Sequence, residues 1–295
     1  MIERGHQIDP PLEESDDDNW DLVIRPYRGW WDLRLWELWQ ARELVTMFVR
    51  RDLLSVYKQT ILGPLWHLFQ PLMTTITYTV IFGRLANLPT DGAPVFLFYM
   101  AGTVLWSYFL ACLTGTANTF IPNAGLFGKV YFPRLAVPIS ILISRLATFG
   151  IQFGLFLICL GYYCVTSGRL LMNGGVLILP VLLVILAGLG LGFGLLISAL
   201  TTRYRDFQQL VGFGSQLLMY ATPVIYPASF VSARYRPYIF ANPMTAVMET
   251  FRWAFIGGGS WSPWGLLYSA GVMVAVLVAG LLLFNRTEAN FVDTV

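Results

Sequence analysis

The chain has 295 residues, of which 56% are hydrophobic and only 12% are charged, and its mean hydropathy is +0.61. Soluble globular domains contain about 25% charged residues, so this composition excludes a soluble domain and indicates a membrane protein. The formal net charge is +2, and the basic residues form no stripe of the kind that binds nucleic acid. The three cysteines lie in apolar runs, so neither a disulfide framework nor a metal site is expected.

The N-terminal region is first acidic and then amphipathic. Residues 1–29 are predicted to be an acidic tail, and they lack the basic and apolar regions of a cleavable signal peptide. The orientation argued below makes this tail cytoplasmic. Between Trp30 and Arg51, apolar residues recur at spacings typical of a helix, which predicts an amphipathic helix in the membrane plane. A helix packed on a soluble partner is the alternative. This interface helix and the entry to the first span occupy residues 30–64. The predicted apolar face comprises Trp31, Leu35, Leu38, Trp39, Val45 and Val49.

Residues 65–285 contain six apolar stretches long enough to cross a bilayer as helices, for which about 20 residues are needed. The fold class is therefore predicted to be an all-α, polytopic membrane protein with six transmembrane helices. The predicted spans are 65–83, 95–121, 138–165, 176–200, 207–226 and 264–284.

The distribution of Lys and Arg predicts the orientation. An even number of spans places both termini on one side, and that side carries 13 basic residues against five on the other. Basic residues are enriched in cytoplasmic loops, so both termini are predicted to be cytoplasmic, including residues 286–295. Arg145 lies inside the third span, where it could reach the cytoplasmic interface or serve a pore.

The external segment 227–263 is too long for a tight turn and too interrupted by proline for a span. Irregular backbone at membrane depth persists only where it is buried in protein or lines water. The segment is therefore predicted to form two short re-entrant or interfacial helices at the exit of a pathway, one of them over Met244 to Ile256. Glu249 and Arg252 are three residues apart and could pair on that helix, or could be a solvated pair of no importance.

Several functional classes lack their usual residues. The six predicted spans contain no Asp, Glu or Lys, which argues against an ion-coupled secondary transporter. The sequence contains no GxxxxGK[ST] phosphate-binding loop, and its only histidines are His6 and His67. We therefore expect a transport subunit that is not an enzyme and that holds no cofactor or metal, with any ATP hydrolysis on a separate chain.

Particular strings resemble one family. Residues 50–71, RRDLLSVYKQTILGPLWHLFQP, resemble the entry to the first span in permease subunits of polysaccharide-exporting ABC transporters of the ABC-2 type, the O-antigen, capsule and teichoic-acid exporters. Residues 122–138, PNAGLFGKVYFPRLAVP, are similar to the coupling segment of that family, although Phe127 and Gly128 depart from it. With RYRDF at 203–207 and Asn242-Pro243, the resemblance extends over about residues 30–285.

The resemblance implies a function and partners. The chain would be the membrane subunit of an ATP-driven exporter that carries a lipid-linked, O-antigen-like polysaccharide across the bacterial inner membrane. It would form a homodimer with two ATPase chains, which would hold ATP and Mg, and would contact membrane lipids but no nucleic acid. An ABC-2 exporter of a small molecule or drug, and a membrane scaffold without a transport role, are the alternatives.

The segment 122–137 is the predicted contact with the ATPase. Its apolar side chains, ringed by charge, suit the groove of a cytoplasmic partner, and the alternative is an interfacial turn anchored in headgroups. The predicted coupling residues are Asn123, Leu126, Phe127, Lys129, Tyr131, Phe132, Pro133, Arg134, Arg205 and Asp206.

Two further sets of residues are predicted to contact the substrate. Arg50, Arg51 and Lys58 lie where a pyrophosphate headgroup would enter, although such residues also arise from ordinary positive-inside topology. Aromatic rings can hold a sugar chain without trapping it, and an aromatic belt facing lipid is the alternative. The predicted channel aromatics are Tyr78, Phe82, Phe96, Tyr99, Trp106, Tyr220 and Tyr226.

Overall fold

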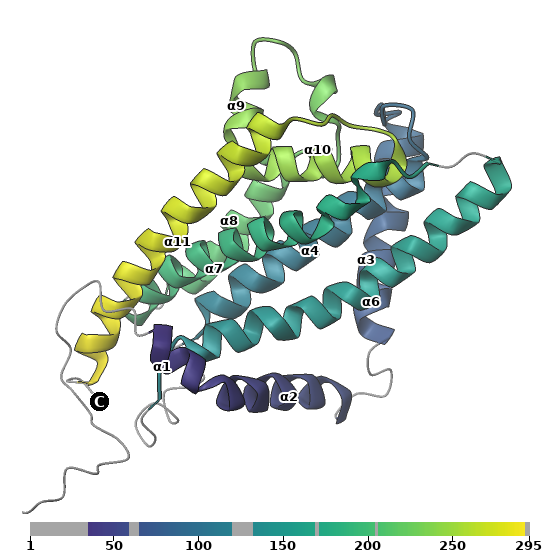
Figure 1. The fold of residues 1–295 in the computed structure, drawn as a ribbon. Coiled ribbons are helices and arrows are strands. Elements are labelled where there is room, and N and C mark those ends of the chain that lie inside the picture. Colours follow the sequence, from purple (N-terminus) through teal and green to yellow (C-terminus); the bar gives the residue numbers. More distant parts are fainter. Residues whose placement is uncertain (1–34, 59–64, 120–131, 169–170, 204–205, 293–295) are drawn as a thin grey trace, which may run out of the picture.

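The computed structural model describes residues 35–58, 65–119, 132–168, 171–203 and 206–292, and these form helices and loops with no strand among them (Figure 1). The all-α class is thus confirmed for the described residues. The α-helices are α1 Leu35–Gln40, α2 Arg42–Lys58, α3 Trp66–Tyr78, α4 Val95–Ala117, α6 Ala136–Ser167, α7 Leu179–Arg203, α8 Phe207–Ala221, α9 Arg236–Ala241, α10 Pro243–Ile256 and α11 Pro263–Val292. A π-helix, η2 Thr79–Leu85, continues α3, and short 3₁₀ turns form η3 Gly174–Ile178 and η4 Ala228–Phe230.

Four helical stretches among the described residues are long and apolar enough to cross a membrane. They are Val95–Ala117, Ala136–Ser167, Gly174–Thr201 and Pro263–Arg286, and they correspond to the predicted second, third, fourth and sixth spans. The chain is therefore a multi-pass membrane protein. The predicted first and fifth spans are also helical, as α3 with η2 and as α8, but neither meets the same criterion of length and hydropathy. The six-span topology stays a prediction.

Helix α4 is the centre of the bundle. It contacts α3, α6, α7, α8 and α10, and most of its residues are buried because it is apolar on every side. Helix α11 packs along α7 at very short range: a Cβ atom on Gly192 would lie 2.8 Å from the backbone nitrogen of Leu277, and one on Gly280 would lie 2.6 Å from the carbonyl oxygen of Gly192. Glycine allows this backbone contact, as is usual between membrane helices.

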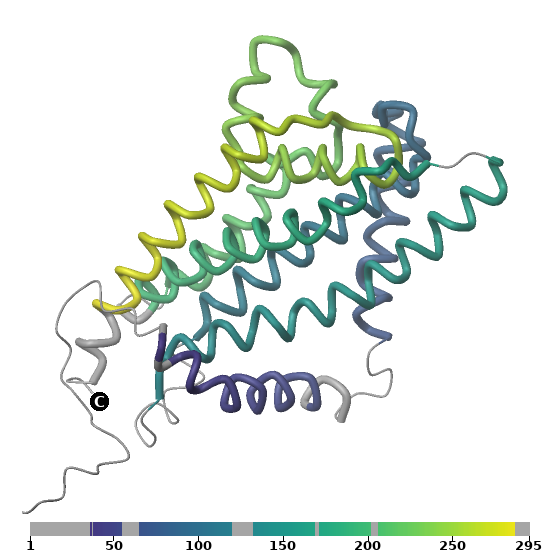
Figure 2. The backbone as a smooth tube through the Cα atoms, viewed as in Figure 1, coloured from purple at the N-terminus to yellow at the C-terminus, as the bar shows by residue number. Residues whose placement is uncertain are grey.

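The two ends of the bundle differ. Helices α1 and α2 lie at one end and α9 and α10 at the other, and α11 returns to the α1 end (Figure 2). The two short helices predicted within residues 227–263 are present as α9 and α10, and their place outside the membrane stays a prediction. Asn242 caps α10 by accepting a hydrogen bond from the Met244 N–H at 3.0 Å.

The predicted interface helix differs from expectation in two ways. It consists of two helices that are interrupted at Ala41, and its apolar side packs on its own chain. Val45 and Phe48 are buried against Ala136 and Val137 at the start of α6. Trp39, which was predicted on the apolar face, is 65% exposed. Leu38, Val45 and Val49 of the predicted face are on the packed side, and Leu44 and Phe48, whose partners lie about 90 residues later in the sequence, complete it.

Candidate functional site

The predicted coupling segment ends against the interface helix. The rings of Phe132 and Phe48 pack with centroids 5.7 Å apart, and Arg134 is buried directly before α6. Asp206 is exposed at the N-terminus of α8. Among the other predicted coupling residues, Pro133 is half-buried. Those that lie outside the described residues are Asn123, Leu126, Phe127, Lys129, Tyr131 and Arg205.

The predicted headgroup entrance lies on α2, and one of its cations is already paired. Arg51 donates from Nε and Nη2 to Asp52 Oδ1 at 3.0 and 2.9 Å, and its guanidinium lies 4.9 Å from the centroid of the Phe48 ring. Arg50 is exposed, and Lys58 is the last residue of α2. An exposed ion pair stabilises little, so Asp52 competes with an incoming anion for Arg51 without excluding one.

The predicted channel aromatics do not share one environment. Tyr99 and Trp106 are 0 and 5% exposed in the core of the chain. They therefore do not lie on a surface of this chain, because neighbouring helices cover most of α4. Tyr220 is exposed, and its carbonyl oxygen accepts a hydrogen bond from Tyr226 Oη at 3.1 Å. Tyr78, Phe82, Phe96 and Tyr226 are half-buried. The role of these residues at a channel stays a prediction.

Helix α8 is covered by its own chain over only a small part of its surface. Ser215 is its only buried residue, and its exposed positions include apolar side chains beside Gln209 and Gln216. Helix α3 similarly exposes Gln70 and Thr77. The two helices meet where Tyr78 Oη donates to Met219 Sδ at 3.6 Å. Amide groups are costly to place against hydrocarbon without partners. Most exposed side chains of the two helices are apolar, so it is their few polar positions that suit protein or water better than lipid.

Helix α10 contains a buried ion pair. Arg252 Nη1 lies 3.4 Å from Glu249 Oε1, and the two side chains are 1 and 3% exposed. Arg252 Nη2 also donates to the Val224 carbonyl oxygen at 2.7 Å, and its guanidinium lies 3.8 Å from the centroid of the Phe98 ring. Glu249 accepts a hydrogen bond from the Ala228 N–H at 3.1 Å. Burial lowers the pKa of Arg252 to about 10, with Glu249 acting in the opposite direction, so the guanidinium is charged at neutral pH.

The sequence left two interpretations of Glu249 and Arg252 open, an ion pair on the helix and a solvated pair of no importance. The second interpretation is wrong, because both side chains are buried. The available signal was the isolation of two opposite charges, three residues apart, in an otherwise uncharged helix. Their burial follows from Phe98 and the segment 224–228, which cover the helix from distant parts of the chain. Charged groups buried in this way are retained only when paired.

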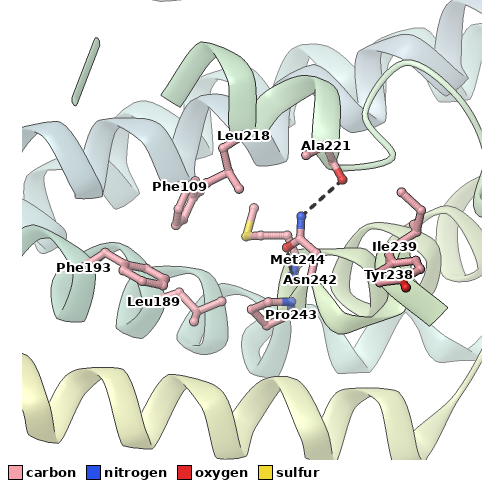
Figure 3. Close-up of a pocket in the computed structure, with 10 residues that line it drawn as sticks. All are labelled: Phe109, Leu189, Phe193, Leu218, Ala221, Tyr238, Ile239, Asn242, Pro243 and Met244. Carbon is pink, nitrogen blue, oxygen red and sulfur yellow. Dashed lines mark hydrogen bonds between the residues drawn. The ribbon is translucent and has the colours of Figure 1, made fainter. Parts of the chain in front are cut away.

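A cavity of about 370 Å³ lies between α4, α7 and α8 and the two short helices α9 and α10 (Figure 3). Figure 3 shows Phe193 and Leu189 of α7 on one side and Leu218 and Ala221 of α8 on another, with α9 at one end. The remaining lining residues are Phe109, Tyr238, Ile239, Asn242, Pro243 and Met244. In the described part of the chain, no three His, Cys, Asp or Glu side chains gather as metal ligands would.

The sequence is similar to a known family and to several of its members. Residues 43–256 match the family model described as ABC-2 type transporter. The chain is 26% identical to the O-antigen export system permease protein RfbA of Klebsiella pneumoniae over 85% of its own length and 94% of the relative. It is 28% identical to the RfbA protein of Myxococcus xanthus, over 88 and 98% of the two chains. It is also 23% identical to the polysialic acid transport protein KpsM of Escherichia coli, over 81 and 91%.

Proposed function

The chain belongs to the ABC-2 type transporter family, a family of membrane transport subunits that pair with ABC ATPases, and from this premise we propose that it exports a lipid-linked polysaccharide. The names of its relatives, O-antigen export permeases and a polysialic acid transport protein, support polysaccharide as the substrate class. In this proposal the substrate is O-antigen-like, the membrane is the bacterial inner membrane, both termini are cytoplasmic, and α3 with η2 and α8 complete six spans.

The observation that carries the proposal is the exposed, partly polar face of α3 and α8. A bundle of this size encloses no wide pore within one chain, and Gln209 and Gln216 would be costly against lipid. A second copy across a twofold axis would cover the apolar part of this face and leave the amides beside a hydrated route. The proposed assembly is therefore a homodimer with two ATPase chains, and the route lies between the two copies.

The contact between Phe48 and Phe132 supports a path for the energy of ATP hydrolysis. Movement of the coupling segment by the ATPase would be transmitted through these rings to α2 and through the adjoining backbone to α6, as a rigid shift of packed helices. Arg50 and Lys58 would attract the pyrophosphate of the substrate at the same end. ATP and Mg would be held by the ATPase chains.

Substrate-stimulated ATP turnover tests the proposed function. The chain and its ATPase would be co-expressed, reconstituted in proteoliposomes, and supplied with a polyprenyl-pyrophosphate-linked glycan or with a panel of hydrophobic drugs. We expect stimulation by the glycan alone, and Phe132→Asp should abolish it while both chains still insert and the variant remains folded. Stimulation by drugs but not by the glycan would instead support a small-molecule exporter. A chain that binds no ATPase would be a scaffold.

A further inference from the structure

Arg145 is a charged residue within a membrane helix. It is the tenth residue of α6. The four helical stretches that meet the membrane criterion contain no other Asp, Glu, Lys or Arg apart from Arg286, which is the last residue of its stretch. Ionisable groups in such helices are costly and are usually retained for a function, together with a partner. The charge of Arg145 therefore needs a counter-charge.

The side chain of Arg145 lies where α6 meets α3 and α4. A Cβ atom on Gly115 of α4 would lie 3.9 Å from Arg145 Nε, and the charge of Arg145 acts on His67 at the start of α3. Gln152, two turns later on the same face of α6, donates to the His67 carbonyl oxygen at 3.1 Å. Arg145 Nε is buried without a hydrogen-bond partner, while the residue as a whole is half-buried. Its outer part thus stays accessible.

The described part of the chain offers no anion to this guanidinium. Helices α3, α4 and α7 pack against α6, and neither they nor α6 contain Asp or Glu. Helix α2 packs at the start of α6 and carries Glu43 and Asp52, of which Asp52 pairs with Arg51. No hydrogen bond or ion pair joins Arg145 to a residue that the structure describes. A counter-charge from another molecule would satisfy it.

The surroundings of Arg145 favour a lipid as that molecule. Ile143 and Leu146, its neighbours in the sequence, are 46 and 43% exposed, so the adjacent surface is apolar. Arg145 lies about 14 Å along α6 from the end on which α2 packs, and a long arginine side chain can extend from that depth toward the headgroups. A soluble anion would have to lose its water there. A lipid brings its phosphate to this depth while its chains cover the apolar surface.

We propose that Arg145 binds the phosphate of an anionic membrane lipid beside α3 and α6. The planar guanidinium donates two N–H groups to two phosphate oxygens, and Ile143 and Leu146 contact the chains of the lipid. The site takes lipid phosphate as a class, which includes bilayer phospholipids and polyprenyl phosphates. It does not depend on which molecule the protein exports.

Thermal unfolding with and without lipid tests this site. The full-length chain and its Arg145→Met variant would be stripped of lipid in a neutral detergent and then supplied with phosphatidylglycerol. Without lipid, the variant should unfold at the same temperature as the wild type or higher, since it removes a charge that has no partner. With the lipid at about a hundred times its Kd, the Tm of the wild type should rise by about 5 °C, and that of the variant should not change. Arg84→Met, at an exposed arginine in η2, is the matched control and should respond as the wild type does.

Photolabelling of the wild-type chain needs no variant and distinguishes the sources of the phosphate. A phosphatidylglycerol with a diazirine beside its phosphate should label Ile143 or Leu146. Displacement of this label by a polyprenyl phosphate at lower concentration than by unlabelled phosphatidylglycerol would assign the site to the polyprenyl class of lipid, and the reverse order would assign it to a bilayer lipid.

Four results would overturn the proposal. They are an equal rise in Tm in the wild type and Arg145→Met, a lower Tm of that variant without lipid, displacement of the label by inorganic phosphate as readily as by phosphatidylglycerol, and no label on residues 141–149. The second result would mean that a group of the chain itself pairs with Arg145. Each of them leaves the proposed export of polysaccharide intact, because that proposal rests on other helices.

Discussion

Arg252 joins three parts of the bundle at the α10 end through one side chain. It pairs with Glu249 on its own helix, donates to the carbonyl oxygen of Val224 after α8, and stacks on Phe98 of α4. Because each of these contacts is buried, the guanidinium has no water to replace a lost partner. Its charge is therefore stable only with Glu249 in place, and the α10 helix is held in one position relative to α4 and α8.

Removing one member of this pair should cost more than removing both. Glu249→Gln leaves a buried charge without its partner, and breaking a buried pair in this way typically costs about 3–5 kcal/mol. The double variant Glu249→Gln with Arg252→Met removes both charges and should be destabilised less. Thermal unfolding of the purified chain in detergent would measure both effects. Arg234→Met, at an exposed arginine, is the control. A single variant as stable as the wild type would mean that the pair contributes nothing.

At the scale of helices, the contact between α7 and α11 depends on two glycines. Any side chain on Gly192 or Gly280 would meet the backbone of the facing helix at under 3 Å. The helices must then move apart, since backbone atoms cannot give way as a flexible side chain can. The contact is thus a property of the pair of helices and not of either alone.

Gly192→Val should therefore lower the free energy of unfolding by about 1–3 kcal/mol, the usual cost of overpacking. Gly154→Val on α6 is a matched control, because a Cβ there meets nothing within 4 Å. The comparison needs only the midpoint of thermal unfolding for the two variants. If both variants unfold at the same temperature, the short contact between α7 and α11 is not the reason for glycine at position 192.

The docking of α2 on α6 gives a second prediction at this scale. Phe48→Ala removes the ring that packs between Phe132 and the start of α6, and loss of a packed phenylalanine costs about 3–5 kcal/mol when it is fully buried. Helix α2 should then open more often, and its amides should exchange faster with deuterium. Met47→Ala, at the neighbouring position that is 58% exposed, should leave the exchange unchanged. Equal exchange in both variants would argue that α2 is held by something other than this packing.

For the whole molecule, the proposed homodimer predicts a specific contact between copies. In a twofold dimer, a residue near the axis faces its own copy, and α8 has a single buried residue, Ser215. Gln216→Cys, in a chain without Cys112, Cys159 and Cys164, should therefore form a disulfide-linked dimer in membranes under mild oxidation. Ile158→Cys on the exposed side of α6 should remain monomeric on a denaturing gel. Dimers from position 158 alone would place the interface on α6.

Local patterns in the sequence predicted many of the elements correctly. The length of the apolar runs predicted the four helices that meet the membrane criterion, and the prolines around residue 243 predicted that the external segment breaks into short helices. The family was also recognisable, because motifs such as RRDLLSVYKQT occur in the expected order before and between the predicted spans. Such predictions depend only on residues that are close in the sequence. The hydrophobicity of a run and the position of a proline each determine where a single helix forms or ends.

The sequence by itself determined the membrane class, the family and the order of the helices. Only the tertiary structure decided which faces are covered: Trp39 is exposed where an apolar face was predicted, Tyr99 and Trp106 lie in the core, and Glu249 and Arg252 are buried as a pair. The cavity below α9 likewise depends on residues from five helices that are far apart in the sequence. The physical reason is that periodicity identifies an apolar face but not its partner, and in a membrane both lipid and protein satisfy such a face.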